Sequence, residues 1–471
     1  MKRVLFIFIA LLAVFACKRD EIVQVDTPDD PVVTPGGDDE DDADDPDDVD
    51  WAKAVAYVFD SSTIPEIRIT TTRDEWQRLL SLYDQNPGTQ EYIHCDISFS
   101  KGSETTTIVD AGLRLKGNTS RRRPEDWGQF HHVHFGVDLH EYNQDAEHTL
   151  KGLRKFDLKW FKDDPMYVRE VFCYDLFQRE GVWTGIRDIY CRLWVNGRYY
   201  GVYGLMEHID KNYLRIREKE FGGHGGNLWK CRCIGSGATL KDEYGSMGVD
   251  DNMTDYAYEL KTNKTNGYSA AEAQLRDFIR NLNSLSGSAF DTWISSHMDV
   301  DLFLKTQAIN VAVGMWDDYW NNANNYYLYF SNKDPKDYKV WLIPYDYDNT
   351  LGTSLNCGVQ SDSGRQDPLK WGHSSYPLAT KILQNETWRA KYVSYLKALC
   401  GSGGNCSPSV GMQRIRSWHS RISSFVSNDT GEDMSIGDQP AYWGNHHEYR
   451  LLESGSNNFF EVKAATVAGI K

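Results

Sequence analysis

The chain has 471 residues, with 51 basic residues against 68 acidic ones and a formal net charge of −17. Its composition, 40% hydrophobic and 25% charged, excludes a wholly disordered or collagen-like chain. The excess of acidic residues argues against a nucleic acid as partner, because affinity for a phosphate backbone comes mostly from Lys and Arg. At this length we expect two or three domains, or one large one.

The acidity is concentrated in residues 18–50, which hold 15 acidic and 2 basic residues and leave a net charge of −6 for residues 51–471. Upstream, residues 1–17 join two basic residues to an apolar run that ends at Cys17, a pattern typical of a lipoprotein signal peptide. The run is too short to span a bilayer. We therefore expect export and a lipid anchor at Cys17, at the outer membrane or cell surface of a Gram-negative bacterium. Residues 18–50 would form a disordered linker, and an ordinary cleaved signal is the alternative.

From residue 51 the chain alternates short β-like runs with helical ones. We expect strands at 64–72, 92–100, 105–117, 155–160, 324–330 and 339–348, and helices at 74–85, 165–180, 271–285, 301–316, 377–400 and 408–427. Asp164 should cap the second helix and Gly181 should end it. Residues 189–209 predict a hairpin with a type I′ turn at Asn196-Gly197, whereas residues 222–267 predict an insertion or a long loop. Hairpins first and helices later indicate an α+β fold.

Eight cysteines follow Cys17, and in an exported protein some of them could pair. Cys400 and Cys406 flank a short Gly-rich stretch, so a disulfide between them would close a small loop. We expect structural rather than catalytic roles for all eight.

Acidic and amide side chains flank the two strands predicted between residues 324 and 348. Because a hairpin brings its ends together, we expect these side chains to converge. Phosphoryl transfer needs one Asp to orient the attacking hydroxyl, and an Asn and an Asp to hold Mg²⁺. Capping of helices and turns by the same residues is the structural alternative. The residues are Asp317, Asn322, Asn325, Asp346 and Asp348.

Five sequence blocks carry a resemblance to a known family. They are GLRLKGNTSRR (112–122), DDPMYVREVFCYDLFQREGV (163–182), VNGRYYGVYGLMEHID (195–210), WDDYWNNANNYYLYF (316–330) and VWLIPYDYDNTLG (340–352). In this order they resemble the spore-coat CotH kinase family, an atypical branch of the protein-kinase-like fold. The resemblance implies a single CotH kinase-like domain over residues 51–471, with antiparallel hairpins followed by a helix-rich C-terminal half.

The same resemblance implies roles for individual residues. The catalytic Asp corresponds to Asp317, with Asp318 as the alternative. The metal ligands correspond to Asp346 or Asp348, which spacing does not separate, and to Asn322 or Asn325. For the base that grips the phosphates of ATP, Lys116 and Arg169 are favoured over Arg114 and Lys159, and Glu207 could pair with that base. The implied cofactors are ATP and Mg²⁺, with Mn²⁺ as the alternative metal.

Three functions remain open at this point. The first is a surface-tethered kinase that phosphorylates Ser or Thr hydroxyls of a protein. The second is an inactive kinase-like or glycan-binding lipoprotein, because ATP is scarce outside cells and exposed aromatic rings stack on sugars. A glycosidase with paired carboxylates is the third, and no sequence block supports it.

Three histidines, His131, His132 and His134, stand where many relatives have a Lys-rich strand. They would bind a metal if alternate strand residues converge, or else lie on a plain exposed strand. If that Lys contacts ATP in those relatives, this chain would lack the contact, which argues against nucleotide binding here.

Overall fold

The computed structural model describes residues 51–145, 148–249, 256–334, 336–353, 362–441 and 447–471. The predicted signal peptide and linker lie outside the described residues. Contacts group the described residues into one unit. Strands prevail before residue 264 and helices after it, which confirms a mixed α and β fold with a helix-rich C-terminal half.

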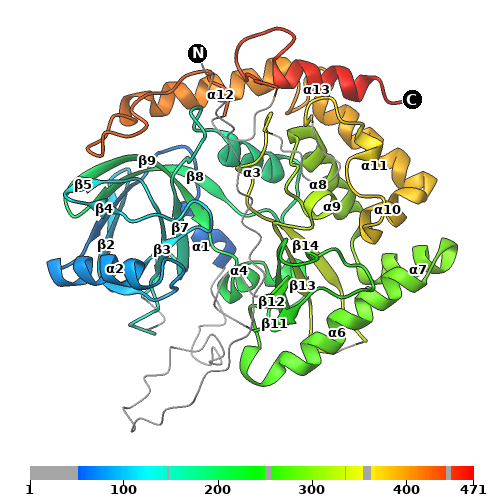
Figure 1. Cartoon of the computed structure of the whole chain (residues 1–471), viewed down its shortest axis with the longest axis horizontal. Helices are drawn as coiled ribbons and strands as arrows, with labels where there is room; N and C mark the ends of the chain where they lie inside the picture. The colour runs from blue at the N-terminus through cyan, green and yellow to red at the C-terminus, as the bar shows by residue number, and fades with distance from the viewer. Residues whose placement is uncertain (1–50, 146–147, 250–255, 335, 354–361, 442–446) are drawn as a thin grey trace, which may run out of the picture. The chain divides into compact units, whose positions relative to one another are not determined.

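Seven strands form a closed barrel in the order β1-β2-β3-β6-β7-β9-β8 (Figure 1). Neighbouring strands are antiparallel, except that β1 and β8 close the barrel as a parallel pair. Fully buried side chains such as Leu113, Phe135 and Leu158 fill its interior, and closure leaves no free strand edge. The strands are β1 (Glu66–Thr70), β2 (Ile93–Lys101), β3 (Glu104–Lys116), β6 (His134–Asp138), β7 (Lys155–Lys159), β8 (Asp188–Val195) and β9 (Arg198–Glu207).

The turn between β8 and β9 confirms the prediction from Asn196-Gly197. Both residues have positive φ, 51° for Asn196 and 77° for Gly197, as a type I′ turn requires. Other small elements lie around the barrel: α1 (Trp51–Val58), α2 (Arg73–Gln85), the hairpin β4 (Glu125–Asp126) and β5 (Gln129–Phe130), α4 (Lys211–Ile216) and α5 (Glu218–Phe221).

Helix α3 (Arg169–Arg179) begins four residues later than predicted. Tyr167 has a φ of 57°, which interrupts the helical path after Pro165. The Asp164 carboxylate still accepts hydrogen bonds from the N–H groups of Val168 (2.8 Å) and Arg169 (2.9 Å). It therefore satisfies the first turn of α3 from outside the cap position.

A second sheet has five strands in the order β11-β12-β10-β13-β14. The prediction of a loop over 222–267 was wrong, because this segment supplies three of these strands. The strand β10 is short, and its Gly- and Asn-rich flanks concealed it in the sequence. The strands are β10 (Asn227–Cys231), β11 (Met247–Gly248), β12 (Tyr258–Leu260), β13 (Tyr326–Phe330) and β14 (Val340–Pro344), of which β13 and β14 form the predicted hairpin.

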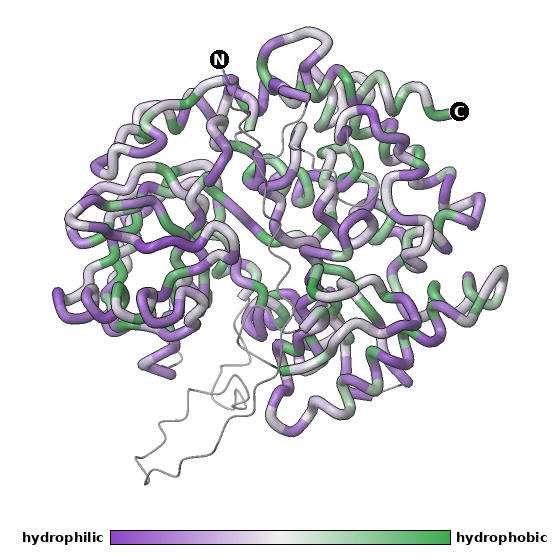
Figure 2. The backbone as a smooth tube through the Cα atoms, in the orientation of Figure 1, coloured by the Kyte–Doolittle hydropathy of each residue, from purple (hydrophilic) through white to green (hydrophobic). Residues whose placement is uncertain are grey.

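Helices pack on one face of this second sheet. The Phe330 ring of β13 lies 5.9 Å from Phe278 of α6, and Tyr326 lies 5.3 Å from Tyr319. In Figure 2, green, hydrophobic tube marks the region of β13 and β14. The helices are α6 (Lys264–Ser284), α7 (Gly287–His297), α8 (Val300–Val313), α9 (Tyr319–Asn322), α10 (Pro377–Gln384), α11 (Glu386–Cys400), α12 (Pro408–Ile422) and α13 (Phe459–Ala468), with 3₁₀ turns η1 (Pro368–Lys370) and η2 (Ser423–Phe425).

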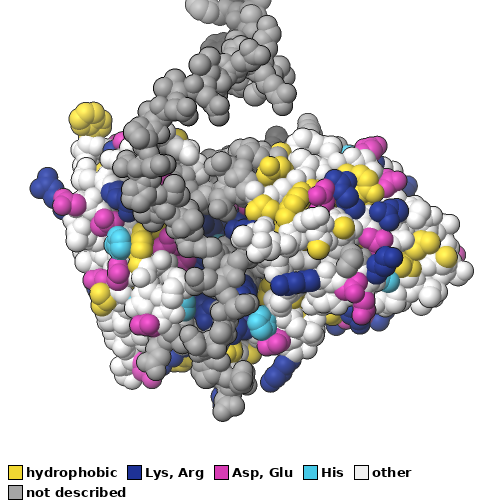
Figure 3. Space-filling view, turned by 90° about the horizontal axis from the view of Figure 1, so that it is seen from below, with side chains coloured by type: hydrophobic (Ala, Val, Ile, Leu, Met, Phe, Trp, Pro, Cys, Tyr) yellow, Lys and Arg dark blue, Asp and Glu magenta, His cyan; other side chains and the backbone are white. Residues whose placement is uncertain are grey.

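The surface carries charges of both signs, and the described cysteines are free thiols. On the face seen in Figure 3, coloured Lys and Arg side chains are interspersed with Asp and Glu. Within the described ranges, no helix has the length and apolar character that a bilayer span requires. Cys400 and Cys406 are both buried thiols, so the loop-closing disulfide considered above is not formed.

Candidate functional site

Asp317 lies in a cage of asparagine amides. Helix α8 ends at Gly314, whose φ is 70°, and the chain then turns so that the Asp317 side chain is only 8% exposed. Both carboxylate oxygens accept amide hydrogens, which hold the group in one orientation. The donors are Asn322 (2.6 Å) and Asn324 (3.0 Å) to Oδ1, and Asn325 (3.0 Å) and Asn349 (3.5 Å) to Oδ2.

The protonation of Asp317 is shifted toward neutrality. Burial raises the pKa of Asp317 to about 6, the negative charge of Asp346 adds to the rise, and the amide hydrogen bonds oppose it. A carboxylate with this pKa exchanges its proton in the range where a general base works best.

Asp318 points away from that cage and caps a helix. Its carboxylate accepts hydrogen bonds from the backbone N–H of Asn321 and from the Asn310 side chain, both at 2.9 Å. The residue is 3% exposed, and burial raises its pKa to about 7. Asp318 thus serves as the N-cap of α9 and fixes the turn that carries Asp317.

The end of β14 delivers a second group of carboxylates beside the first. Asp346, with a φ of 60°, forms an ion pair with Lys159 of β7. Lys159 also contacts Glu170 of α3 at 2.8 Å and Asp348 at 3.8 Å. Asn349, one residue later, reaches the Asp317 cage. One lysine of the barrel therefore gathers three carboxylates from α3 and from the end of β14.

Burial and neighbouring charges shift the pKa values of this group in different directions. Burial would raise the pKa of Asp346, but the Lys159 ammonium outweighs it and the pKa lies below its ordinary value. Burial, and next the charge of Asp346, place the pKa of Asp348 well above the ordinary value. Burial works against the charge of Lys159, yet Asp346 and Glu170 hold its pKa well above normal.

A second lysine lies in a neighbouring pair on the barrel. Lys116 of β3 contacts Asp157 of β7, and His208 Nδ1 lies 3.0 Å from the same carboxylate. Burial opposes the charge of Asp157, but Lys116 and His208 hold its pKa well below the ordinary value. Lys116 is thus already neutralised by a carboxylate.

The model of the family described as CotH kinase protein matches residues 113–451. The chain belongs to the CotH kinase protein family. The resemblance predicted from five sequence blocks is confirmed.

Two relatives that the chain matches are distant from it in sequence. Over 345 residues the chain is 22% identical to invasin CotH7 of Rhizopus delemar, covering 72% of this chain and 52% of that protein. Over 208 residues it is 26% identical to the inner spore coat protein H of Bacillus subtilis, covering 44% of this chain and 53% of that protein. The chain thus spans about half the length of the curated relatives that it matches.

Two arginines implied by the CotH resemblance lie in contacts of their own. Arg114 is buried over the Tyr92 ring, 5.2 Å from its centroid. Arg169 pairs with Asp164 and donates to the Thr350 carbonyl at 3.1 Å. Neither contact involves the carboxylates of Asp317 or Asp346. The two arginines join segments of the fold instead.

Glu207 likewise has a buried partner. Arg217 donates to both of its carboxylate oxygens, at 2.7 and 2.6 Å, and the Glu207 side chain has no exposed surface. This ion pair connects the end of β9 to the residue that follows α4.

The three histidines of the CotH chain do not converge. His131 lies 3.0 Å from Glu432, His132 lies 3.4 Å from Asp433, and His134 accepts a hydrogen bond from the Trp160 N–H at 3.0 Å. His134 begins the fully buried strand β6, so the plain exposed strand considered above was wrong. The first two histidines contact Glu432 and Asp433 in residues 426–433, which form the C-terminal strap.

Several site residues were missed or ranked low from the sequence. Lys159, placed behind Lys116 and Arg169, is the lysine that contacts Asp346. Alternation in the strand 155–160 puts Lys159 on the same face as Asp157, which is the signal that could have raised its rank. Asn324 gave no signal beyond the asparagine-rich stretch, and Asn349 gave none beyond its place in the block 340–352.

The carboxylates of the CotH site suit Mg²⁺, which takes oxygen ligands and keeps water and phosphate oxygens in its shell. Within the described ranges, no cluster of three or more Asp, Glu, His or Cys side chains could hold a metal. However, Asp348 Oδ1 is buried and has no hydrogen-bond partner. This oxygen lies near Asp346 and Asp317, and a metal ion held there would need further oxygen ligands from phosphate or water.

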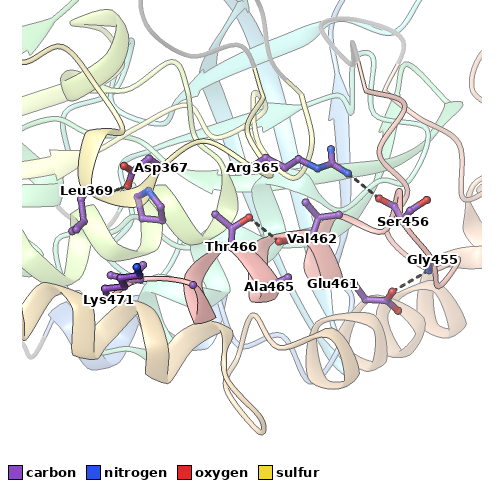
Figure 4. A pocket seen from close by; sticks show the side chains of 13 residues that line it. Arg365, Asp367, Leu369, Gly455, Ser456, Glu461, Val462, Ala465, Thr466 and Lys471 are labelled. Carbon is purple, nitrogen blue, oxygen red and sulfur yellow. Dashed lines mark hydrogen bonds between the residues drawn. The ribbon is translucent and has the colours of Figure 1, made fainter.

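A separate groove of about 1060 Å³ runs along α13, between Arg365 and Lys471 (Figure 4). Its polar groups bind each other: Arg365 donates to the Ser456 carbonyl at 3.2 Å, and Thr466 to the Val462 carbonyl at 2.9 Å. The residues that line it include none of the candidate site residues.

Proposed function

We propose that this chain is a surface-tethered phosphotransferase with an atypical protein-kinase-like fold, which transfers the γ-phosphoryl group of ATP to Ser or Thr hydroxyls of a protein. The observation that carries the proposal is the caged Asp317 carboxylate beside the strand end with Asp346 and Asp348. Membership of a family described as kinase-like supports it.

Each residue has a role that its surroundings favour. The Asp317 carboxylate, oriented by four amides and with a pKa of about 6, would accept the hydrogen of the attacking hydroxyl. Asp346 and Asp348 would hold Mg²⁺ or Mn²⁺, which neutralises charge on the transferred phosphoryl group. Lys159 would keep Asp346 ionised and in place. Because the transition state needs little covalent help, fixed charges of this kind supply most of the rate.

The test is transfer of label from [γ-³²P]ATP, with Mg²⁺ or Mn²⁺, to the chain itself and to a panel of Ser- and Thr-rich proteins. We expect Asp317→Asn to lower the rate by about 100-fold or more, the range of a lost general base. The matched control is Asp337→Asn, because Asp337 is exposed in the loop at the other end of the β13–β14 hairpin. Absence of transfer by the unmodified protein, under every metal and acceptor, would refute the proposal and leave an inactive kinase-like binder.

Tethering at the cell surface is part of the proposal. The relatives named above are called an invasin and a spore coat protein, names that support an exposed location for this chain. The anchor at Cys17 lies outside the described residues. Cys17→Ser should move the protein from the membrane fraction to the soluble fraction, and unchanged fractionation would count against the lipid anchor.

A further inference from the structure

Lys230 lies on the second sheet beside the candidate site, and no sequence pattern pointed to it. In β10 it stands opposite Tyr327 of β13 and Glu259 of β12. Its ammonium lies 5.3 Å from the ring centroid of Tyr345 and 5.9 Å from that of Tyr327. Tyr345 directly precedes Asp346, so Lys230 and the carboxylates occupy the same end of the sheet.

Lys230 differs from the other lysines of the site in its partners. Lys116 contacts Asp157, and Lys159 contacts Asp346. For Lys230, no carboxylate of the described residues lies within the 4 Å of an ion pair. The nearest in register, Glu259, is held by Arg232 and by Lys261, the latter at 2.8 Å.

The charge of Lys230 nevertheless acts on the Asp346 carboxylate of the site. After Lys159, it is the next ammonium that lowers the pKa of Asp346. Burial and, next, the positive charge of Arg232 lower the pKa of Lys230 to about 7, although the charge of Glu259 opposes the shift. An ammonium in such surroundings gains more from an incoming anion than one already paired, because no existing ion pair has to be broken.

We propose that Lys230 is the cation that contacts the phosphate chain of the nucleotide, while Lys116 and Lys159 hold carboxylates; this assignment rests on the proposed function. The ligand chemistry is a polyphosphate with several negative charges, and Lys binds such groups as a point charge. Aromatic rings on the sheet support the ammonium by cation–π contact and leave its hydrogens available for phosphate oxygens.

The assignment places the phosphate contact and the carboxylates on one rigid element. Lys230 and Tyr327 are paired across β10 and β13, and Asp346 follows the end of β14, which pairs with β13. Their separation is therefore set by the second sheet. In the alternative from the sequence, with Lys116 as the phosphate contact, that separation would also depend on how the barrel lies against the sheet.

The test is calorimetric titration of the full chain with Mg·ATP, with tripolyphosphate and with adenosine. Loss of a charge-assisted contact in Lys230→Met should weaken binding of Mg·ATP and tripolyphosphate by about 10- to 100-fold, and leave adenosine unaffected. The matched control is Lys261→Met, because Lys261 lies beside the same sheet but is paired with Glu259. It should bind all three ligands within about twofold of the unmodified protein.

The outcomes separate the two proposals. Equal binding of tripolyphosphate by Lys230→Met and the unmodified protein would overturn the role of Lys230 and leave the kinase proposal standing. An unmodified protein that binds neither Mg·ATP nor tripolyphosphate would overturn both.

A second measurement needs no variant. Brief acetylation followed by mass spectrometry should modify Lys230 in the unmodified protein, and tripolyphosphate should protect it. Lys116 and Lys159, held by carboxylates, should remain unmodified in both samples. Equal acetylation of Lys230 with and without tripolyphosphate would also overturn the assignment.

Discussion

The ion pair of Glu207 and Arg217 allows a quantitative test of how the barrel is held to α4. The replacement is Arg217→Met, which keeps an apolar stem of similar length but removes the guanidinium. It leaves the Glu207 carboxylate, which has no exposed surface, with the Arg187 backbone N–H at 3.1 Å as its remaining donor among the described residues.

The expected loss follows from this burial. Breaking a buried pair by removing one partner costs about 3–5 kcal/mol, out of the roughly 5–15 kcal/mol that folded domains have. Replacing both partners in Glu207→Met/Arg217→Met removes the stranded charge, so most of the loss should be recovered. An exposed pair such as Arg280 with Asp277, where the Arg280 side chain is 61% exposed, should contribute less than about 1 kcal/mol.

The loss should also depend on pH. Burial opposes ionisation of Glu207, but Arg217 holds its pKa below the ordinary value. That contribution is therefore present above the unfolded pKa of Glu and disappears as the pH falls through the folded value. Without Arg217, the opposition to burial comes from Arg187, through its charge and its backbone N–H, so the pKa of Glu207 should rise relative to the unmodified protein. The carboxylate of the variant then takes up a proton on acidification, and the deficit relative to the unmodified protein shrinks.

Urea unfolding of the three variants and the unmodified protein, followed by circular dichroism at about pH 7 and pH 5, measures these differences. The control is Arg280→Met. The reasoning would be refuted by a double variant no more stable than Arg217→Met, because the cost would then arise from lost packing rather than from a stranded charge.

Two further predictions concern the lysine at the site and the thiols. Lys159→Met should lower the free energy of unfolding by about 2–4 kcal/mol near pH 8, a buried-pair loss reduced by the partial exposure of Asp346. The loss should shrink near pH 5 because the stranded carboxylates take up protons, and a pH-independent loss in urea titrations would contradict this origin. A maleimide should label the exposed Cys233 in the native protein, but label the buried Cys173 and Cys191 only in denaturant. Mass spectrometry of tryptic peptides gives the answer, and native labelling of Cys191 would contradict the closed barrel.

Local patterns in the sequence were enough for much of the fold. Asn196-Gly197 predicted its turn because only residues that tolerate positive φ fit there. Strands β13 and β14 and helix α8 followed from the period of their apolar residues. The strand β10 was missed because its five residues, between Gly-rich flanks, show no clear alternation of apolar and polar side chains. Helix α13 was also missed, because the last predicted helix ended at residue 427.

The site shows where such reasoning ends. That Asp317 and Asp318 differ, one in an amide cage and the other capping α9, depends on which way each side chain turns. Lys159 and Asp346 are 187 residues apart in the chain, and only closure of the barrel and of the second sheet brings them together. Composition can suggest that a lysine meets a carboxylate, but the choice between Lys116, Lys159 and Lys230 is made by tertiary structure.

The C-terminal strap has a mechanical consequence. The chain leaves the barrel after β9 and comes back after α12, where Asp429 and Tyr199 exchange two hydrogen bonds at 2.8 and 2.9 Å. Asp433 adds a bond to the Trp160 indole at 2.7 Å, one residue beyond Lys159. Because the strap is bonded to the barrel at both Tyr199 and Trp160, the barrel cannot move away from the strap by rotation about a single hinge. A large movement of this kind must first break the hydrogen bonds of residues 426–433. In a shortened chain that lacks these residues, the barrel should be less restrained than in the whole protein.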